Sequence, residues 1–167
     1  MAKAMELAEI DTILIGDSLG MAIQGRDSTL PVTVEDMAYH TVAVRRGNQH
    51  ALIMTDLPFM SYATLSDALQ SSKVVMQAGA QMVKVEGGAW LAETVQVLTR
   101  NGIPVCVHLG LTPQSVHVFG GYKLQARTRE AADQLIADCQ AVVDAGAAVL
   151  LLECVPAQLG KEISELF

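Results

Sequence analysis

The sequence has few aromatic residues and no excess of positive charge, and both shortages argue against one class of protein. Aromatic residues make up 4% of the 167 residues, and 18 Asp and Glu against 11 Lys and Arg give a net charge of −7. A nucleic-acid-binding protein needs a basic face that neutralises phosphates and aromatic rings on which bases stack. We therefore expect no nucleic acid among the partners of this chain.

Long apolar runs and cysteine motifs are also missing. The longest apolar run, residues 145–152, is far shorter than the about 20 residues that cross a bilayer. The first ten residues carry Lys3, Glu6 and Glu9 in a helical pattern, which is not typical of a signal peptide. The three cysteines lack metal or redox spacing, as expected of reduced thiols. The sequence thus predicts a soluble, cytoplasmic chain without a membrane partner.

What the sequence does contain is enough apolar material for one core. Hydrophobic residues make up 51% and charged residues 17%, a balance that excludes disorder. The length corresponds to about one domain of ~150 residues. Because no linker, repeat or low-complexity segment interrupts the chain, we predict a single domain over residues 1–167.

Apolar runs rich in Val, Ile and Leu predict five buried strands, at residues 12–16, 51–55, 82–85, 104–107 and 148–152. Amphipathic stretches predict helices at roughly 2–9, 34–46, 65–78, 89–100, 129–144 and 156–166. Strands that alternate with helices through short turns indicate a parallel α/β sheet. Two long connections, 18–31 and 109–127, follow strands and are candidates for function.

Helix ends are marked by recognisable residues. Thr33 with Asp36, and Thr64 with Asp67, have the spacing of a capping box at a helix start. Four glycines stand where the helical patterns stop, and each is predicted to end its helix in a left-handed conformation: Gly47, Gly79, Gly102 and Gly146.

An acidic residue or a histidine follows every predicted strand. These residues are Asp17, Asp56, Glu86, His108 and Glu153. The 167 residues include only 18 Asp and Glu and four His. Chance therefore does not account for five strands in a row that are each followed by one of these residues. The carboxyl ends of parallel strands lie at one edge of the sheet, where α/β folds place their sites.

Three of these residues, Asp17, Asp56 and Glu86, predict a metal site. Carboxylates with no thiolate nearby suit a hard cation, Mg²⁺ before Ca²⁺ or Zn²⁺, and without a cation they would repel one another. The alternative for each acid is a structural role at its strand end, bonded to a helix amide. Taken as a set, the three favour the metal.

Lys84, His108 and Glu153 can each be interpreted in two ways, as a structural residue or as part of a functional site. Lys84, inside an apolar strand, either pairs with Glu86 or binds an anionic substrate, and we favour the substrate. His108 is either a structural residue or part of the site. Glu153 follows an apolar stretch that would make it a stronger base, but it is equally read as a buried carboxyl bonded to backbone amides.

Motifs along the whole chain resemble those of the ketopantoate hydroxymethyltransferase (3-methyl-2-oxobutanoate hydroxymethyltransferase) family. They are GDSLG at 16–20, DSTLPVT at 27–33, YHT at 39–41, VRRG at 44–47, DLPFM at 56–60, VKVEGG at 83–88, HLGLTPQS at 108–115, GGYK at 120–123 and LECVP at 152–156. The resemblance implies a (β/α)₈ barrel enzyme of pantothenate biosynthesis, a cytoplasmic homo-oligomer that uses Mg²⁺ and 5,10-methylenetetrahydrofolate.

Site residues follow from the same resemblance. It implies that Asp17, Asp56 and Glu86 surround the metal, that Asp17, Ser18, Asp56 and Lys84 hold the α-keto acid, and that Glu153 is the proton acceptor. We place His108 with the substrate-binding residues. The implied reaction moves a hydroxymethyl group from the folate to 3-methyl-2-oxobutanoate through a Mg²⁺-stabilised enolate, giving 2-dehydropantoate.

The chain departs from the family in length and at two positions. A full barrel needs about 250 residues and eight strands, whereas five strands are predicted here. Open sheet edges expose unpaired backbone groups, so we expect an incomplete barrel of low stability and weak activity. Val107 and Ala126 stand where the family pattern leads us to expect glycines.

Two other functions compete with this one. The first is another Mg²⁺-dependent barrel enzyme acting on α-keto acids, of the carbon–carbon lyase type, which would form no folate-dependent product. The second is a truncated, catalytically weak fragment. Loss of Mg²⁺ and keto-acid binding on Asp17→Ala or Asp56→Ala would argue against the fragment.

Overall fold

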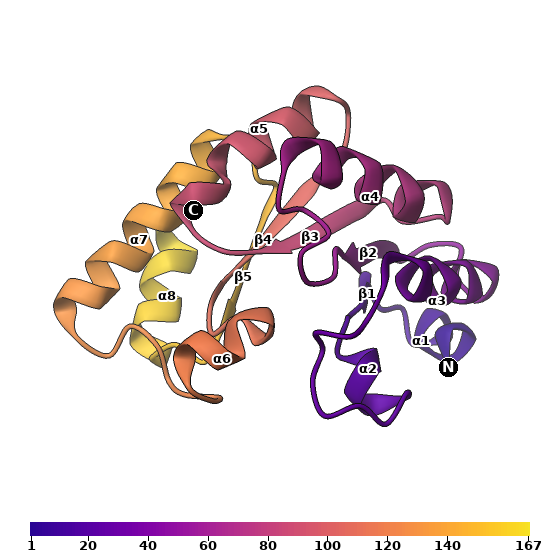
Figure 1. Ribbon diagram of the computed structural model, residues 1–167, viewed down its shortest axis with the longest axis horizontal. Helices are drawn as coiled ribbons and strands as arrows, with labels where there is room; N and C mark the ends of the chain where they lie inside the picture. The colour runs from indigo at the N-terminus through magenta and orange to yellow at the C-terminus, as the bar shows by residue number, and fades with distance from the viewer. The chain divides into compact units, whose positions relative to one another are not determined.

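Parallel strands alternate with helices along the chain, as the apolar pattern predicts. The computed structural model describes residues 1–167, which form two compact units, Met1–Val85 and Glu86–Phe167 (Figure 1). We refer to these as the first unit and the second unit. No helix combines the length and the apolar character of a membrane span.

The first unit is built on three parallel strands. Its elements are α1 (Ala2–Leu7), β1 (Thr12–Ile15), α2 (Leu19–Ala22), α3 (Val34–Gly47), β2 (Leu52–Asp56), α4 (Leu65–Gln77) and β3 (Met82–Glu86), whose last residue opens the second unit. β1 pairs with β2 and β2 with β3, all parallel. Met37 of α3, Ile53 of β2 and Val75 of α4 are fully buried, so the two longer helices contribute to the same core as the strands.

The second unit carries the other two strands. Its elements are η1 (Ala89–Leu91), α5 (Ala92–Arg100), β4 (Val105–Gly110), η2 (Pro113–Ser115), α6 (Val116–Phe119), α7 (Arg129–Asp144), β5 (Val149–Glu153) and α8 (Ala157–Leu166). β4 pairs in parallel with β5, with Gly110 opposite Glu153. β4 is buried from Val105 to Leu109, whereas no residue of β5 is fully buried. The five predicted strands are all present, each within a few residues of its predicted bounds.

Three of the four predicted glycine stops are confirmed. Gly79, Gly102 and Gly146 have φ values of +116°, +80° and +106° just after their helices. The prediction for Gly47 is wrong, because this residue is the last of α3 and Asn48 ends the helix in an extended conformation. A Cβ at Gly47 would lie 3.1 Å from Cβ of Ala2, so a larger residue would push α1 away by a few tenths of an ångström.

The short helices α2, η2 and α6 are absent from the sequence prediction. All three lie in the two long connections after β1 and β4. Each has three or four residues, about one turn, which is too little for a 3.6-residue period to be visible.

All three cysteines are free thiols, as expected. Cys106 and Cys139 are buried and Cys154 is exposed. Burial, together with the neighbouring Asp138 carboxylate, raises the pKa of the Cys139 thiol to about 11. The Cys139 thiol therefore stays protonated at neutral pH. Cys139 belongs to the buried face of α7.

The start of α3 has the predicted capping box. The Asp36 N–H donates to the Thr33 hydroxyl, and the Thr33 N–H donates to the Asp36 carboxylate, both over 3.1 Å. At α4 the Thr64 hydroxyl caps the Asp67 N–H, but the Asp67 carboxylate accepts from the Thr64 hydroxyl, so the reciprocal bond of a full box is not formed there.

We expect Thr33→Ala to lower the free energy of unfolding by about 1 kcal/mol, because the first turn of α3 loses its hydroxyl acceptor. Thr33→Ser keeps the acceptor and should lose much less. The Thr33 N–H lowers the pKa of Asp36 below its ordinary 3.8, so the Asp36 contribution is fully present above pH 3.8 and is lost as the pH falls through the lowered value. Urea unfolding followed by circular dichroism measures both effects; equal loss in both variants would contradict the cap.

Candidate active site

In the first unit, the ends of β1 and β2 bring Asp17 and Asp56 together. The backbone N–H of Asp17 donates to Oδ2 of Asp56 over 3.0 Å. The two residues are 3% and 2% exposed. Two of the three predicted metal ligands therefore lie at the same end of neighbouring strands, as the strand-end argument predicts.

Gly16 makes the space in which these groups meet. A Cβ at this position would lie 3.0 Å from Oγ of Ser18 and 3.6 Å from Oδ2 of Asp56. The first distance is too short for an unstrained carbon contact, so a larger residue would displace the Ser18 hydroxyl. The Ser18 hydroxyl and the Asp56 carboxylate thus both lie close to Gly16, on the same side as the Asp17–Asp56 hydrogen bond.

Lys84 joins this cluster through an ion pair. Its Nζ lies 3.2 Å from Oδ1 of Asp56, and both side chains are 3% exposed. The parallel register sets the two residues opposite each other on β2 and β3. The sequence suggests Glu86 as a structural partner of Lys84, and the structure adds Asp56 as a second partner. The cluster therefore offers a buried positive charge beside the two carboxylates.

In the second unit, Glu86 is held by two neighbours. Nδ1 of His108 lies 3.2 Å from its Oε1, and the backbone N–H of Gln114 donates to its Oε2 over 3.0 Å. Glu86 and His108 are 4% and 3% exposed. Because the Gly87 N–H also donates to the His108 carbonyl, the ends of β3 and β4 are fixed to each other here.

Glu153 contacts the opposite side of the same imidazole. Nε2 of His108 lies 3.4 Å from Oε2 of Glu153, whose side chain is 41% exposed. The expectation of an apolar environment, and the alternative of a buried carboxyl bonded to amides, are both wrong for this side chain. The physical reason is that β5 is only partly covered, so its last residue reaches solvent. His108 thus connects a buried carboxylate with an accessible one.

The chain around Glu153 is tied to the long connection after β4. The Leu111 N–H donates to the Glu153 carbonyl and the Gln125 N–H to the Cys154 carbonyl, both over 2.8 Å. Cys154 has a φ of +49°, a left-handed conformation that is uncommon outside glycine. These backbone contacts have no signature in the sequence and cannot be predicted from it.

The predicted metal ligands have the donor chemistry of a Mg²⁺ site. Asp17, Asp56 and Glu86 are buried carboxylates at strand ends, and carboxylate oxygens are what a hard cation prefers. Asp17 and Asp56 belong to the first unit and Glu86 to the second. No group of three or more His, Cys, Asp or Glu side chains is arranged to hold a metal ion in the structure. The three-carboxylate site therefore stays a prediction.

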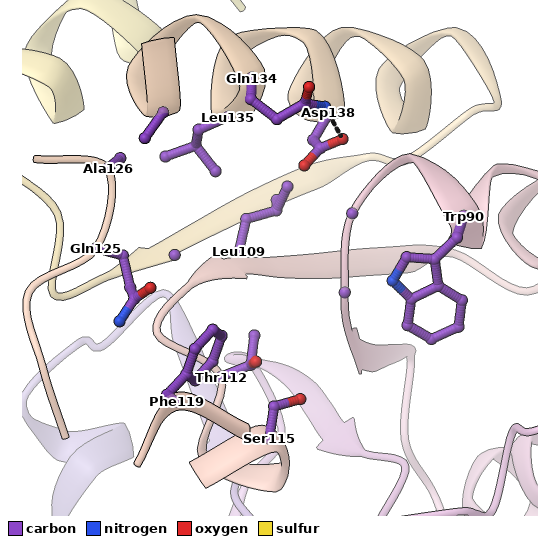
Figure 2. A pocket seen from close by; sticks show the side chains of 14 residues that line it. Trp90, Leu109, Thr112, Ser115, Phe119, Gln125, Ala126, Gln134, Leu135 and Asp138 are labelled. Atoms are coloured by element: carbon purple, nitrogen blue, oxygen red, sulfur yellow. Dashed lines mark hydrogen bonds between the residues drawn. The ribbon is translucent and has the colours of Figure 1, made fainter. Parts of the chain in front are cut away.

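A pocket of about 350 Å³ lies entirely within the second unit, lined by residues that follow β3, by the end of β4 and by α7. Figure 2 shows Leu109 of β4 between α7, which carries Gln134 and Asp138, and the segment of Thr112, Ser115 and Phe119. Ala126, one of the two departures from the family pattern, lines this pocket with a φ of +51°, where glycine would be unstrained. No pattern in the sequence predicts this pocket.

Comparison with solved structures defines the class of fold. The chain is similar to 2,3-dimethylmalate lyase, described as a PEP mutase/isocitrate lyase superfamily member, with a TM-score of 0.70 and 16% identity over 98% of this chain and 56% of that one. It is also similar to oxaloacetate acetylhydrolase in complex with the product oxalate, with a TM-score of 0.73 and 11% identity over 99% and 59%. The predicted class, an α/β fold of the (β/α)₈ barrel type with five of the eight strands, is confirmed.

Sequence comparison defines the family within that class. Residues 1–167 match the family described as ketopantoate hydroxymethyltransferase, and the chain belongs to it. It is 92% identical to the 3-methyl-2-oxobutanoate hydroxymethyltransferase of Acinetobacter baumannii (strain AYE) over 167 residues, 100% of this chain and 62% of the relative. The protein of the same name from Psychrobacter sp. (strain PRwf-1) is 63% identical over 98% of this chain and 61% of the relative. The chain thus spans less than two thirds of these curated relatives.

We expect Lys84→Met to lower the free energy of unfolding by about 3–5 kcal/mol, because the buried Asp56 carboxylate loses its ammonium partner. The double variant Lys84→Met/Asp56→Asn removes that charge as well and should recover most of the loss. Lys73→Met, at an exposed lysine of α4, is the matched control. Urea unfolding measures all three; a loss in Lys84→Met no larger than in the control would contradict the role of the ion pair.

Proposed function

We propose that this chain carries the keto-acid site and the base of a 3-methyl-2-oxobutanoate hydroxymethyltransferase. The reaction moves the one-carbon unit of 5,10-methylenetetrahydrofolate to 3-methyl-2-oxobutanoate and gives 2-dehydropantoate. Family membership supports the reaction class. The observation that carries the proposal is the accessible Glu153 carboxylate at the end of β5, which lies 3.4 Å from Nε2 of His108.

The cluster of the first unit suits the α-keto acid. Lys84 supplies a buried positive charge for an anionic substrate, and the Ser18 hydroxyl, which lies close to Gly16, can donate a hydrogen bond to it. Because these groups are fixed before a substrate arrives, little reorganisation is needed when negative charge develops on the keto oxygen. Asp17 and Asp56 complete the proposed binding set.

Asp17, Asp56 and Glu86 are the residues that would hold Mg²⁺. When bound, the ion supplies Lewis acidity to the carboxylate and keto oxygens of the substrate. Lys84 balances part of the negative charge of this set whether or not the ion is present, because it is paired with Asp56.

Glu153 is the proposed general base. It accepts the proton from C3 of the keto acid, and the electron pair of the broken C–H bond moves into the keto group, giving the enolate. C3 of the enolate then forms a bond to the methylene carbon of the folate as one of the two carbon–nitrogen bonds of that carbon breaks, and the released nitrogen takes up the proton held by Glu153. Water replaces the second nitrogen on the same carbon: its oxygen becomes the hydroxyl of the hydroxymethyl group, one of its protons goes to that nitrogen, and tetrahydrofolate leaves. His108 positions the Glu153 carboxylate for the first step by contacting its Oε2.

Two properties of the whole protein are also proposed from the family resemblance. They are a cytoplasmic location and a homo-oligomeric state. The runner-up activity, carbon–carbon bond cleavage by a related barrel, is supported by fold likeness alone. Folate-dependent formation of product separates the two activities, because a lyase has no use for the folate.

We expect Glu153→Gln to slow exchange of the C3 proton of 3-methyl-2-oxobutanoate with D₂O by at least about 100-fold, because the amide cannot accept the proton. Proton magnetic resonance of the keto acid, with Mg²⁺ present and no folate, measures the exchange. Glu165→Gln, at an exposed glutamate of α8, is the matched control and should exchange at the parent rate. Parent-like exchange in Glu153→Gln would refute its role as the base.

We expect this chain to unfold at a lower temperature, and to turn over more slowly, than a full-length relative such as the A. baumannii enzyme. Its edge strands leave apolar side chains in solvent, with Leu14 of β1 at 42% and Val149 of β5 at 36% exposure. Differential scanning calorimetry and a product assay, run on both proteins in one buffer, test this. Equal melting temperatures and equal turnover would show that the five strands suffice.

A further inference from the structure

We propose that Asp138 of α7 is a positioning residue of the candidate site. Its carboxylate holds the two-glycine turn that follows β3, Gly87–Gly88, and so keeps Glu86 in place against His108. The proposal rests on the proposed function, in which Glu86 would hold the metal ion. Because Asp138 acts on Glu86 through the backbone of the turn, its role is to position another residue and not to take part in the chemistry.

Two backbone hydrogen bonds fix the turn directly after Glu86. The Gly87 N–H donates to the His108 carbonyl over 3.0 Å, which ties the turn to β4. The Leu91 N–H donates to the Gly88 carbonyl over 2.9 Å, which ties the turn to η1. Because Glu86 is the residue before the turn, a shift of the turn also shifts the backbone that carries the Glu86 carboxylate.

Side chains from two elements pack closely against the glycines of this turn. A Cβ at Gly87 would lie 2.5 Å from Cζ2 of Trp90, and a Cβ at Gly88 would lie 2.7 Å from Oδ2 of Asp138. Real Cβ atoms do not come so close to a neighbour, so both positions need glycine for these contacts to form. The turn therefore lies against an indole ring at Gly87 and against a carboxylate at Gly88.

Hydrogen bonds fix the Asp138 carboxylate in this position. Its Oδ1 accepts from the Ala89 N–H over 3.3 Å and from Nε2 of Gln134 over 3.1 Å. Figure 2 shows the second bond as a dashed line between two side chains of α7. Ala89 is the first residue of η1, where a backbone N–H lacks a partner within the helix, so the carboxylate supplies one. Asp138 thus contacts this segment twice, by packing at Gly88 and by a hydrogen bond at Ala89.

The contacts of Glu86 make it sensitive to a shift of the turn. Nδ1 of His108 lies 3.2 Å from its Oε1, and the Gln114 N–H donates to its Oε2 over 3.0 Å. The first distance is at the upper end of the range of N–H···O hydrogen bonds, so a small further shift of Glu86 would break this contact. Removal of a group that orients a metal ligand commonly lowers metal affinity or activity by about 10- to 100-fold.

The imidazole of His108 reports the position of Glu86, because the two side chains are in direct contact. We expect Asp138→Ala to shift the ring-nitrogen resonances of His108 at fixed pH, with no metal and no substrate added. Nuclear magnetic resonance of protein with isotope-labelled histidine measures this shift. The chain has four histidines, and the signal that disappears in His108→Gln identifies the one from His108. Circular dichroism checks the fold of each variant.

Two single variants are the controls for this shift. Asp138→Asn keeps a side-chain oxygen that can accept from the segment after β3, so His108 should give its parent resonances. Asp144 of α7 accepts a hydrogen bond from Gln140 four residues earlier, the same arrangement as at Asp138. Asp144→Ala therefore removes an equivalent bond of the helix and should leave the His108 resonances unchanged.

Gly88→Ala displaces the Asp138 carboxylate from the opposite side, because its added Cβ needs the space of Oδ2. We expect this variant to shift the His108 resonances as well. In the double variant Gly88→Ala/Asp138→Ala the added Cβ has room, so the shift should be no larger than in Asp138→Ala alone. Gly88→Ala also carries the test if Asp138→Ala does not fold.

We expect Asp138→Ala to slow C3 exchange of 3-methyl-2-oxobutanoate about tenfold, and both controls to exchange at the parent rate. Unshifted His108 resonances or parent-like exchange in folded Asp138→Ala, or an equal shift in either control, would each overturn the positioning role. The outcome is separable from that of the proposed function. If the parent protein shows no C3 exchange, the proposed function falls, and the His108 resonances alone decide the role of Asp138. Exchange in the parent with unshifted His108 resonances in Asp138→Ala would remove the positioning role and leave the function in place.

Discussion

The candidate site depends on one constraint: charged groups buried at strand ends need partners that the sheet itself supplies. The Lys84–Asp56 ion pair meets this constraint in the first unit, where both side chains are 3% exposed. In the second unit, His108 and the Gln114 N–H do the same for Glu86. Charges held in this way need little reorganisation when a charged substrate arrives, which is the property that an active site requires.

Much of the fold could be predicted from the sequence because its signals are local. Apolar runs mark the strands, Thr33 marks the start of α3, and Gly79 marks the end of α4. The grouping of Asp17 with Asp56, and of Glu86 with His108, also follows from the rule that parallel strands end at one edge. The prediction for Gly47 is wrong because the conformation of this residue depends on α1, whose residues Ala2 and Lys3 lie far away in the chain, and no local pattern reveals that contact.

The rest of the site depends on register and burial, which the sequence does not encode locally. Lys84 pairs with Asp56 because the register of β2 and β3 sets them opposite each other. Glu153 reaches solvent because β5 is only partly covered, although its apolar sequence predicts burial. The pocket is assembled from segments between Gly87 and Asp138 that share no motif, so only the folded chain reveals it.

Two hydrogen bonds to peptide carbonyls at the end of β5 fix the long connection that follows β4. The carbonyls of Glu153 and Cys154 accept from Leu111 and Gln125, one near each end of the segment that carries Phe119. Two backbone hydrogen bonds therefore fix this segment to the end of β5, where the proposed base Glu153 lies. The backbone on which Glu153 stands is therefore fixed by residues that lie about 30 to 40 positions earlier in the chain, at both ends of one loop.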